Sequence, residues 1–228
     1  MIELFNITKT FNAGKQNEFT ALRGLSVSLD INQITALKGP SGSGKTTLLS
    51  IIACMARPTS GRMMFQGREI TSLPERFLSE IRRKTFGFIF QSFNLIKGLS
   101  VLENTMIPAY PMGIKYRVIK ERAMVLLEKL NIASKAHQRV EHLSGGEQQR
   151  TAMARALINE PAIVIADEPT AHLDTELAES FMYLISVLHA EGKTILIASH
   201  DPLVFEADIV HRVIELRDGE IRKERRTR

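Results

Sequence analysis

The stretch ITALKGPSGSGKTTLLSIIA, residues 34–53, decides the fold. Its opening apolar run, 34–37, predicts a short buried strand, and the run at 46–56 predicts a helix. Between them the eight residues GPSGSGKT, 39–46, match the pattern G-x-x-x-x-G-K-[ST]. This pattern between a strand and a helix is typical of a loop that binds phosphate groups.

Each residue type of this loop has a physical role. The glycines let backbone N–H groups converge on phosphate oxygens without a Cβ in the way, and the following helix points its positive end at the same place. Lys45 supplies a point charge for the β- and γ-phosphates, and the Thr46 hydroxyl can ligate Mg²⁺. The alternative is a glycine-rich turn without a ligand. The predicted nucleotide-binding residues are Gly39, Pro40, Ser41, Gly42, Ser43, Gly44, Lys45, Thr46 and Thr47.

Outward from the loop, short apolar strands alternate with amphipathic helices. The runs at 162–166 and 194–198 are apolar at almost every position, as strands covered on both faces are. An apolar stripe at helical spacing runs through 175–191, with Thr175 as its expected N-cap. These signals predict an α/β fold with a sheet that is at least partly parallel.

The domain organisation follows from where the strand signals stop. Between 92 and 159 the patterns are mostly helical and the buried-strand runs vanish. We therefore expect one domain over 1–228, in which residues 1–91 and 160–228 form the core and residues 92–159 form an inserted helical subdomain.

Composition excludes several classes of protein. With 44% hydrophobic and 24% charged residues, the chain is neither disordered nor fibrous. A single cysteine, Cys54, excludes a disulfide scaffold and fits a reducing compartment. We expect neither a signal peptide nor a membrane-spanning helix. The net charge of +5 favours anionic ligands or surfaces, and the basic stretch 222–228 is expected to be a frayed, solvated end, with lipid headgroups or a partner as the alternative.

Two carboxylates follow the apolar strand at 162–166. Because ligands bind at the carboxyl edge of an open α/β sheet, Asp167 and Glu168 are expected beside the phosphate loop. Asp167 would hold Mg²⁺, directly or through water, and Glu168 would polarise a water molecule for attack on the γ-phosphate. The alternative is an acidic pair that opens a solvated loop.

A second glycine-containing helix start reads LSGGEQ, residues 143–148. Ser144 and Glu147 have the spacing of a capping box, so a purely structural role is one interpretation. The functional interpretation is a second anion-binding helix start, with free N–H groups on Ser144, Gly145 and Gly146.

LSGGEQ, with a phosphate loop upstream and a strand ending in Asp-Glu downstream, is similar to the signature set of ATP-binding cassette (ABC) ATPases over essentially the whole chain. The resemblance implies a P-loop fold with a mostly parallel core sheet, an N-terminal antiparallel part and an inserted helical subdomain. It implies ATP and Mg²⁺ as ligands. It assigns catalytic roles to Glu168, His200, Gln91 and Lys45, and Mg²⁺ contacts to Thr46, Gln91 and Asp167. Phe11 falls where the family places an aromatic ring against adenine.

The resemblance also implies partners. Family members pair head to tail, so Ser144, Gly145, Gly146, Gln148 and Asp174 are expected to contact the ATP of a second copy. Residues 73–108 resemble the lipoprotein-export, macrolide-export and FtsE-like branch, in which a separate membrane permease is driven. We expect the permease to dock near an apolar patch formed by Phe93, Leu95, Ile96 and Leu99, and the chain to lie on the cytoplasmic face of the cell membrane. The alternative is that this patch belongs to the core of the helical subdomain itself.

The chain departs from the branch pattern at residues 168–174, which read EPTAHLD, where Ala171 and His172 replace Gly and Asn. Lys38 stands where an apolar residue is common. Three other functions stay open: an FtsE-like ATPase that transmits force without transport, an ABC protein of nucleic acid or ribosomes, and a P-loop kinase. About 100 residues separate Thr46 from Ser144, too few for the coiled coils of DNA-repair members, and we expect no nucleic-acid partner. The sequence names neither the cargo, nor its direction, nor the permease.

Overall fold

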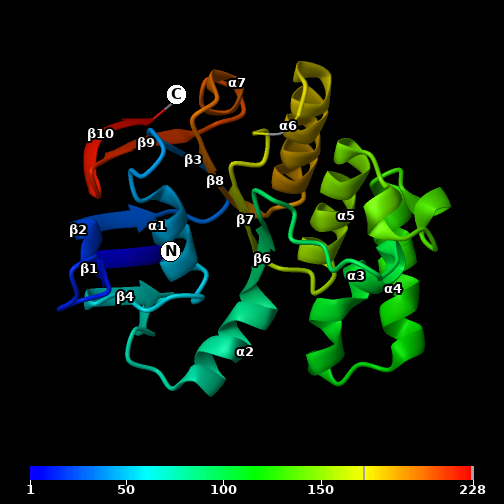
Figure 1. Ribbon diagram of the computed structural model, residues 1–228, viewed down its shortest axis with the longest axis horizontal. Helices are drawn as coiled ribbons and strands as arrows, with labels where there is room; N and C mark the ends of the chain where they lie inside the picture. Colours follow the sequence, from blue (N-terminus) through cyan, green and yellow to red (C-terminus); the bar gives the residue numbers. More distant parts are fainter. Residues whose placement is uncertain (172, 227–228) are drawn as a thin grey trace.

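Two β-sheets with helices around them make up the computed structural model, which describes residues 1–171 and 173–226 (Figure 1). The smaller sheet has the order β2-β1-β4-β5, and each neighbouring pair of strands is antiparallel. Its strands are β1 (Ile2–Phe11), β2 (Phe19–Leu29), β4 (Ser60–Phe65) and β5 (Arg68–Glu69).

The larger sheet has the order β10-β9-β3-β8-β7-β6. Its strands pair in parallel from β9 to β6, and β10 alone pairs antiparallel, with β9. The bounds are β3 (Ile34–Lys38), β6 (Phe86–Ile89), β7 (Ile163–Asp167), β8 (Thr194–Ser199), β9 (Arg212–Arg217) and β10 (Glu220–Arg226). The prediction of a mostly parallel core sheet with an N-terminal antiparallel part is therefore confirmed.

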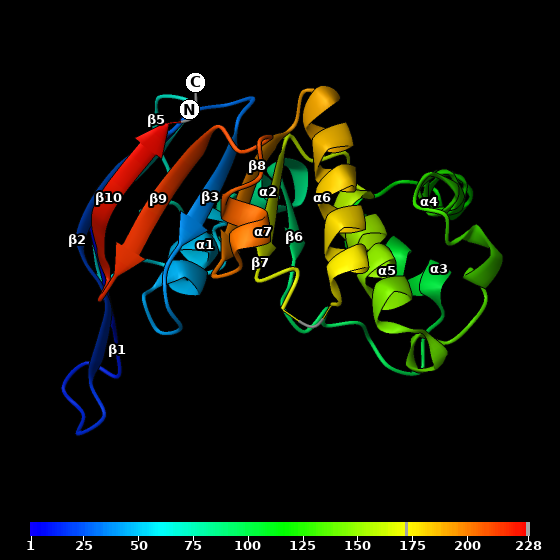
Figure 2. The ribbon, with the colours of Figure 1, turned by 90° about the horizontal axis from the view of Figure 1, so that it is seen from above.

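Helices lie on both faces of the larger sheet. Between β6 and β7 the chain is helical, with α3 (Val101–Met106), η1 (Ile107–Met112), α4 (Tyr116–Lys129), η2 (Ala133–Lys135), η3 (Val140–His142) and α5 (Gly145–Leu157). The others are α1 (Lys45–Ile52), α2 (Glu75–Thr85), α6 (Thr175–Ala190) and α7 (Pro202–Phe205). Seen from above, α6 lies between the larger sheet and the group α3–α5 (Figure 2).

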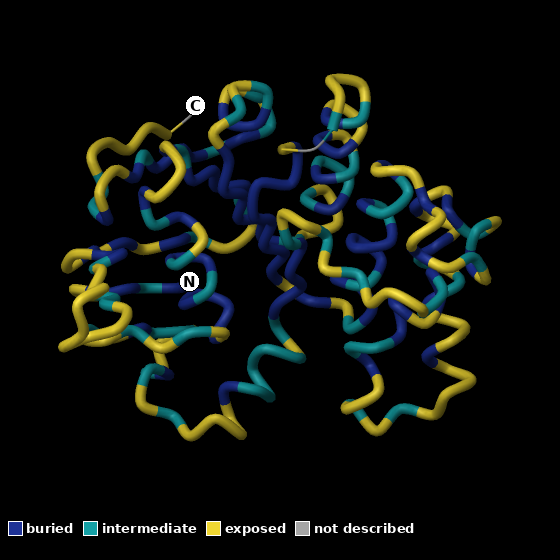
Figure 3. Tube along the Cα trace, viewed as in Figure 1, coloured by how far each residue is buried: buried dark blue, intermediate teal, exposed yellow. Residues whose placement is uncertain are grey.

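The central strands are buried on both faces, and their side chains alternate between two apolar clusters. Ala36 and Ile197 pack with α3–α6, whereas Leu37 and Leu196 pack with α1 and the antiparallel sheet. In Figure 3 the buried trace runs unbroken through this centre. This burial explains why the runs at 162–166 and 194–198 carry no alternating polar residues.

The parallel strands end together, and this positions the functional residues. Lys38 pairs with Ser199, and Asp167 pairs with Ala198, so the carboxyl ends of β3, β7 and β8 lie at one edge. The phosphate loop leaves β3 at that edge. No helix within the described ranges is long and apolar enough to cross a bilayer.

Three local expectations are corrected. The N-cap of α6 is Asp174 and not Thr175, because the Asp174 carboxylate accepts the Leu177 backbone N–H at 2.9 Å. The first helix is shorter than 46–56, since it runs from Lys45 to Ile52. The basic stretch is not frayed over residues 222–226, which belong to β10. His172 and residues 227–228 lie outside the described part of the chain.

Candidate functional site

A cleft of about 250 Å³ opens at the carboxyl edge of the larger sheet. Most of the phosphate loop lines it, together with residues from four other segments. The lining residues are Phe19, Ala21, Ser41, Gly42, Ser43, Gly44, Lys45, Thr46, Thr47, Gln91, Glu168 and His200. The fold thus brings the sequence-predicted loop, Glu168, Gln91 and His200 to one place.

Two glycines allow the loop to pack closely. A Cβ on Gly39 would lie 2.2 Å from the Leu216 carbonyl oxygen, and Gly44 has a φ of +101° with the Ala21 carbonyl oxygen 2.6 Å from its Cβ position. Side chains at these positions would clash with backbone that has nowhere to move. Glycine at these two positions therefore lets the loop pack against β2 and β9.

The Lys45 ammonium is held by three oxygens at the base of the loop. Its Nζ donates to the carbonyl oxygens of Gly39 at 2.7 Å and Pro40 at 3.1 Å, and it lies 3.1 Å from Glu168 Oε1. The Lys45 side chain is buried, so this charge is strongly felt by any anion that enters the cleft.

Glu168 connects Lys45 to His200. Its Oε2 lies 2.8 Å from His200 Nδ1 and accepts the His200 backbone N–H at 3.3 Å. The His200 side chain is 60% exposed and faces the cleft, whereas that of Glu168 is 10% exposed. Glu168 also has a φ of +46°, a conformation that a non-glycine residue rarely adopts. A carboxylate held between an ammonium and an imidazole at a cleft wall is placed to accept a proton from water.

Asp167 lies one residue earlier and is deeper. Its Oδ1 accepts the Thr46 hydroxyl at 3.1 Å, and the residue is 5% exposed. Burial raises the pKa of the Asp167 carboxyl, while the Thr46 hydrogen bond opposes the rise and the neighbouring Glu168 charge adds to it. A cation beside this carboxylate would offset the cost of its burial.

Oxygen donors of the kind that Mg²⁺ prefers meet at this point. Thr46 and Asp167 touch each other, and Gln91 lines the same cleft. The described residues contain no group of three or more His, Cys, Asp or Glu side chains that could hold a metal by themselves. Mg²⁺ normally binds through one or two carboxylates with substrate phosphates and water, so this donor set fits it.

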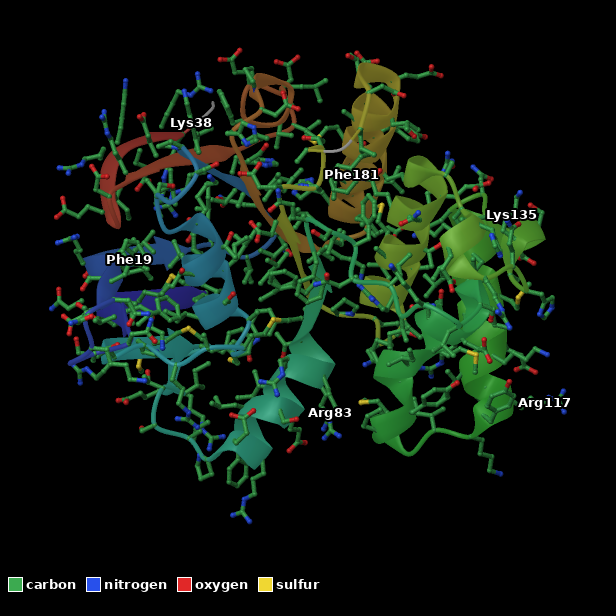
Figure 4. All side chains as sticks on the ribbon, viewed as in Figure 1. Phe19, Lys38, Arg83, Arg117, Lys135 and Phe181 are labelled. Carbon is green, nitrogen blue, oxygen red and sulfur yellow. The ribbon has the colours of Figure 1, made fainter. Side chains whose placement is uncertain are left out.

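The aromatic residue that lines the cleft is Phe19, next to the predicted Phe11. Phe11 does not line the cleft, and the Lys9 ammonium lies 5.0 Å from the centre of its ring. Phe19, labelled in Figure 4, borders the cleft from the start of β2 and is 55% exposed. The two residues are direct partners across the β1–β2 pair. Sequence reasoning missed Phe19, and its signal was an aromatic residue at the start of the strand opposite Phe11.

The signature residues lie at the start of α5, away from the cleft lining. Ser144 and Glu147 form the complete capping box: Ser144 Oγ accepts the Glu147 N–H at 3.3 Å, and Glu147 Oε2 accepts the Ser144 N–H at 2.8 Å. The Ser144 N–H is therefore not free, contrary to expectation. Ser144 and Gly145 are exposed, Gly146 is buried against Leu177, and Gln148 donates to the Leu143 carbonyl at 3.1 Å. Asp174, the cap of α6, is exposed.

Comparisons with known proteins identify the family to which this chain is similar. A family model described as ABC transporter matches residues 22–171. The macrolide export ATP-binding/permease protein MacB of Hyphomonas neptunium is 42% identical over 97% of this chain, which spans only 34% of that protein. The uncharacterized ABC transporter ATP-binding protein YknY of Bacillus subtilis is 39% identical, over 97% of this chain and 95% of its own length.

A solved structure covers the whole chain. The dimeric structure of a bacterial ABC transporter cassette superposes with a TM-score of 0.91 and 38% identity, covering 100% of this chain and 99% of that one. A second structure of that cassette, a post-hydrolysis state bound to ADP and Pi, gives a TM-score of 0.90 at 36% identity.

Proposed function

The chain belongs to the ABC transporter family of ATP-binding proteins, and from that premise we propose that it is the ATPase subunit that drives a separate membrane permease in export or extraction. The single observation that carries the catalytic part is Glu168, held between Lys45 and His200 at the wall of the phosphate-loop cleft. Export is supported by relatives named for macrolide and pyoverdine export.

In the proposed reaction the loop backbone and Lys45 bind the triphosphate of ATP. The entering phosphate replaces Glu168 as the partner of Lys45, which frees the carboxylate to take a proton from the attacking water. His200 orients Glu168 and contacts the γ-phosphate. Gln91, which follows β6, contacts the attacking water. Thr46, Asp167 and Gln91 would hold Mg²⁺, which supplies charge neutralisation on the phosphates. Phe11 is the proposed stacking partner of the adenine, and Phe19, its cross-strand partner at the cleft, is the second candidate.

The active form is proposed to be a head-to-tail dimer. The start of α5 is exposed and lies outside the cleft lining, so it can serve the nucleotide of a second copy through Ser144, Gly145, Gly146 and Gln148, with Asp174 beside the interface. The similar cassette solved as a dimer supports this arrangement.

The permease is proposed to dock beside Gln91. Of the expected patch, Leu95 packs against the core, Phe93 and Leu99 are half-buried, and Ile96 is 48% exposed. Near this patch lies a mostly apolar groove of about 390 Å³, which is lined by residues such as Phe90 and Pro108. Arg83 Nε and Asn159 Oδ1 are buried at this groove without a hydrogen-bond partner among the described residues. Copurification from membranes tests the partnership, which would place the chain at the cytoplasmic face.

An FtsE-like role, in which force is transmitted without transport, is the second candidate. It shares the site and the partner, so substrate release in a reconstituted complex distinguishes the two.

The central experiment is Glu168→Gln in the full chain with ATP and Mg²⁺. Loss of a general base is expected to slow hydrolysis by about 10²–10⁴-fold while ATP binding persists, so that dimers accumulate in light scattering. Glu128→Gln, an exposed substitution on α4, is the matched control and should hydrolyse normally. Parental turnover by the Glu168→Gln variant, or a particle that stays monomeric with saturating ATP, would contradict the proposal.

A further inference from the structure

Gln149 is a buried polar side chain that the catalytic scheme does not use. It lies on α5, is 4% exposed, and its Nε2 donates to the carbonyl oxygen of Pro169 at 2.9 Å. Thr151, two residues further along α5, keeps its hydroxyl bond within the helix, to the Glu147 carbonyl at 2.8 Å. Gln149 instead joins α5 to the loop that directly follows the proposed base.

That loop is fixed from several sides around a strained residue. Glu168 has φ +46°, and its backbone N–H donates to the Ala198 carbonyl at 2.8 Å. Its carbonyl accepts the Ala171 N–H at 3.2 Å. Thr170 Oγ1 donates to Asp201 Oδ2 at 3.0 Å. A left-handed conformation at a non-glycine residue persists only where its surroundings enforce it, and the Gln149 bond restrains the segment from the helical side.

We propose that Gln149 is a positioning residue that holds the Glu168 loop in its reactive conformation and ties it to the signature helix. The inference rests on the proposed function, in which Glu168 is the base and Ser144 meets the partner's nucleotide. Gln149 follows Ser144 by five residues, about 7.5 Å along the helix axis. In a head-to-tail dimer, α5 thus touches the nucleotide of one site at its start and holds the base of the other site through Gln149. Occupancy of one site then sets the geometry of the other.

The test replaces Gln149 with Leu, which keeps the volume and removes the donor. ATP hydrolysis is expected to fall about tenfold in kcat, with KM for ATP within about twofold and the Hill coefficient moving toward 1. Thr151→Val removes a buried hydrogen bond that stays inside the same helix, so it is the matched control and should keep parental kcat and cooperativity.

Two further variants separate positioning from general damage. A glutamate at position 149 can donate only when protonated, so Gln149→Glu should recover activity relative to the parent as pH is lowered from about 8 to about 6. In the Glu168→Gln background, Gln149→Leu should still dimerise with ATP, because the start of α5 is untouched.

Three results would overturn this inference without affecting the proposed function. The first is a Gln149→Leu variant with the kcat and Hill coefficient of the parent. The others are an equal loss of kcat in Thr151→Val and a loss of ATP-driven dimers in the double variant. A parent chain without ATPase activity would instead contradict the proposed function, and this inference with it.

Discussion

Buried ionisable side chains in this molecule differ in what compensates the free-energy cost of their burial. Glu168 and Asp167 are buried charges at the cleft: the first is neutralised by Lys45, and the second accepts a hydroxyl and is left with a raised pKa. Cys54, the sole cysteine, is buried beneath the antiparallel sheet and 6% exposed. Burial raises the pKa of its thiol to about 11, despite the nearby Arg82 charge that lowers it. The two carboxylates thus have polar partners at the cleft, whereas the Cys54 thiol lies in an apolar cluster that keeps it unreactive.

At the residue scale, Cys54 is expected to resist alkylation. At pH 8 a thiol of pKa about 11 is ionised in roughly one molecule in a thousand, against about one in four for an ordinary cysteine. Iodoacetamide labelling followed by mass spectrometry should therefore be slow in the folded protein and fast in guanidinium. Equal labelling rates in the two conditions would show that the thiol is neither buried nor shifted.

At the scale of the element, α5 is both a structural helix and a candidate ligand surface. It has the same capping box as α3, where Ser100 and Glu103 bond reciprocally at 3.2 and 2.8 Å. The α3 start lies outside the cleft and outside the proposed dimer contacts. The pair of helices therefore offers a direct comparison between capping alone and capping combined with ligand binding.

Ser144→Ala and Ser100→Ala should each cost about 0.5–2 kcal/mol of stability through loss of the cap. In a chain of this size that corresponds to a Tm lower by roughly 2–4 °C per kcal/mol. Only Ser144→Ala should also reduce ATPase activity and ATP-driven dimerisation. Calorimetry and turnover measured on both variants check this, and similar activities in the two would leave Ser144 as a cap and nothing more.

At the scale of the whole molecule, β10 closes one edge of the larger sheet and carries an ion pair that links distant segments. Arg212, 3% exposed, donates to Glu224 through Nε and Nη2, each at 2.8 Å, and its Nη1 donates to the Ser28 carbonyl of the antiparallel sheet. The Arg212 hydrogen bond holds the pKa of Glu224 below its usual range. The buried guanidinium of Arg212 is therefore one of the links between the two sheets.

Because the folded-state pKa of Glu224 is depressed, its contribution to stability is present above the unfolded pKa and is lost as pH falls through the folded one. Glu224→Gln should lower the free energy of unfolding at pH 7 by about 1–2 kcal/mol, moderated by the partial exposure of Glu224. The difference from the parent should shrink as pH drops below about 4. Urea unfolding at both pH values measures it, and a pH-independent difference would contradict the ion-pair explanation.

Much of the fold was predictable because its signals are local. The apolar runs of β7 and β8 and the loop 39–46 depend on burial and backbone freedom at neighbouring residues, and the sequence analysis found them. The cap of α6 was missed by one residue, since Asp174 and Thr175 are both good caps and only the backbone path selects one. The strand at 222–226 was missed because its residues are polar. Its ladder partner, β9, and the buried Arg212 supply the stabilisation that its own composition does not indicate.

The amino-acid order alone determined that this chain has a phosphate loop, a strand ending in two carboxylates and a capped glycine helix start, because each is a short run whose chemistry is set by adjacent residues. Tertiary structure decided which side chains meet. The contacts of Glu168 with Lys45 and His200, the place of Phe19 at the cleft and the bond from Gln149 to Pro169 join residues far apart in the chain. Such contacts depend on strand order and helix packing, which minimise exposed apolar surface over the whole molecule, and no local pattern encodes them.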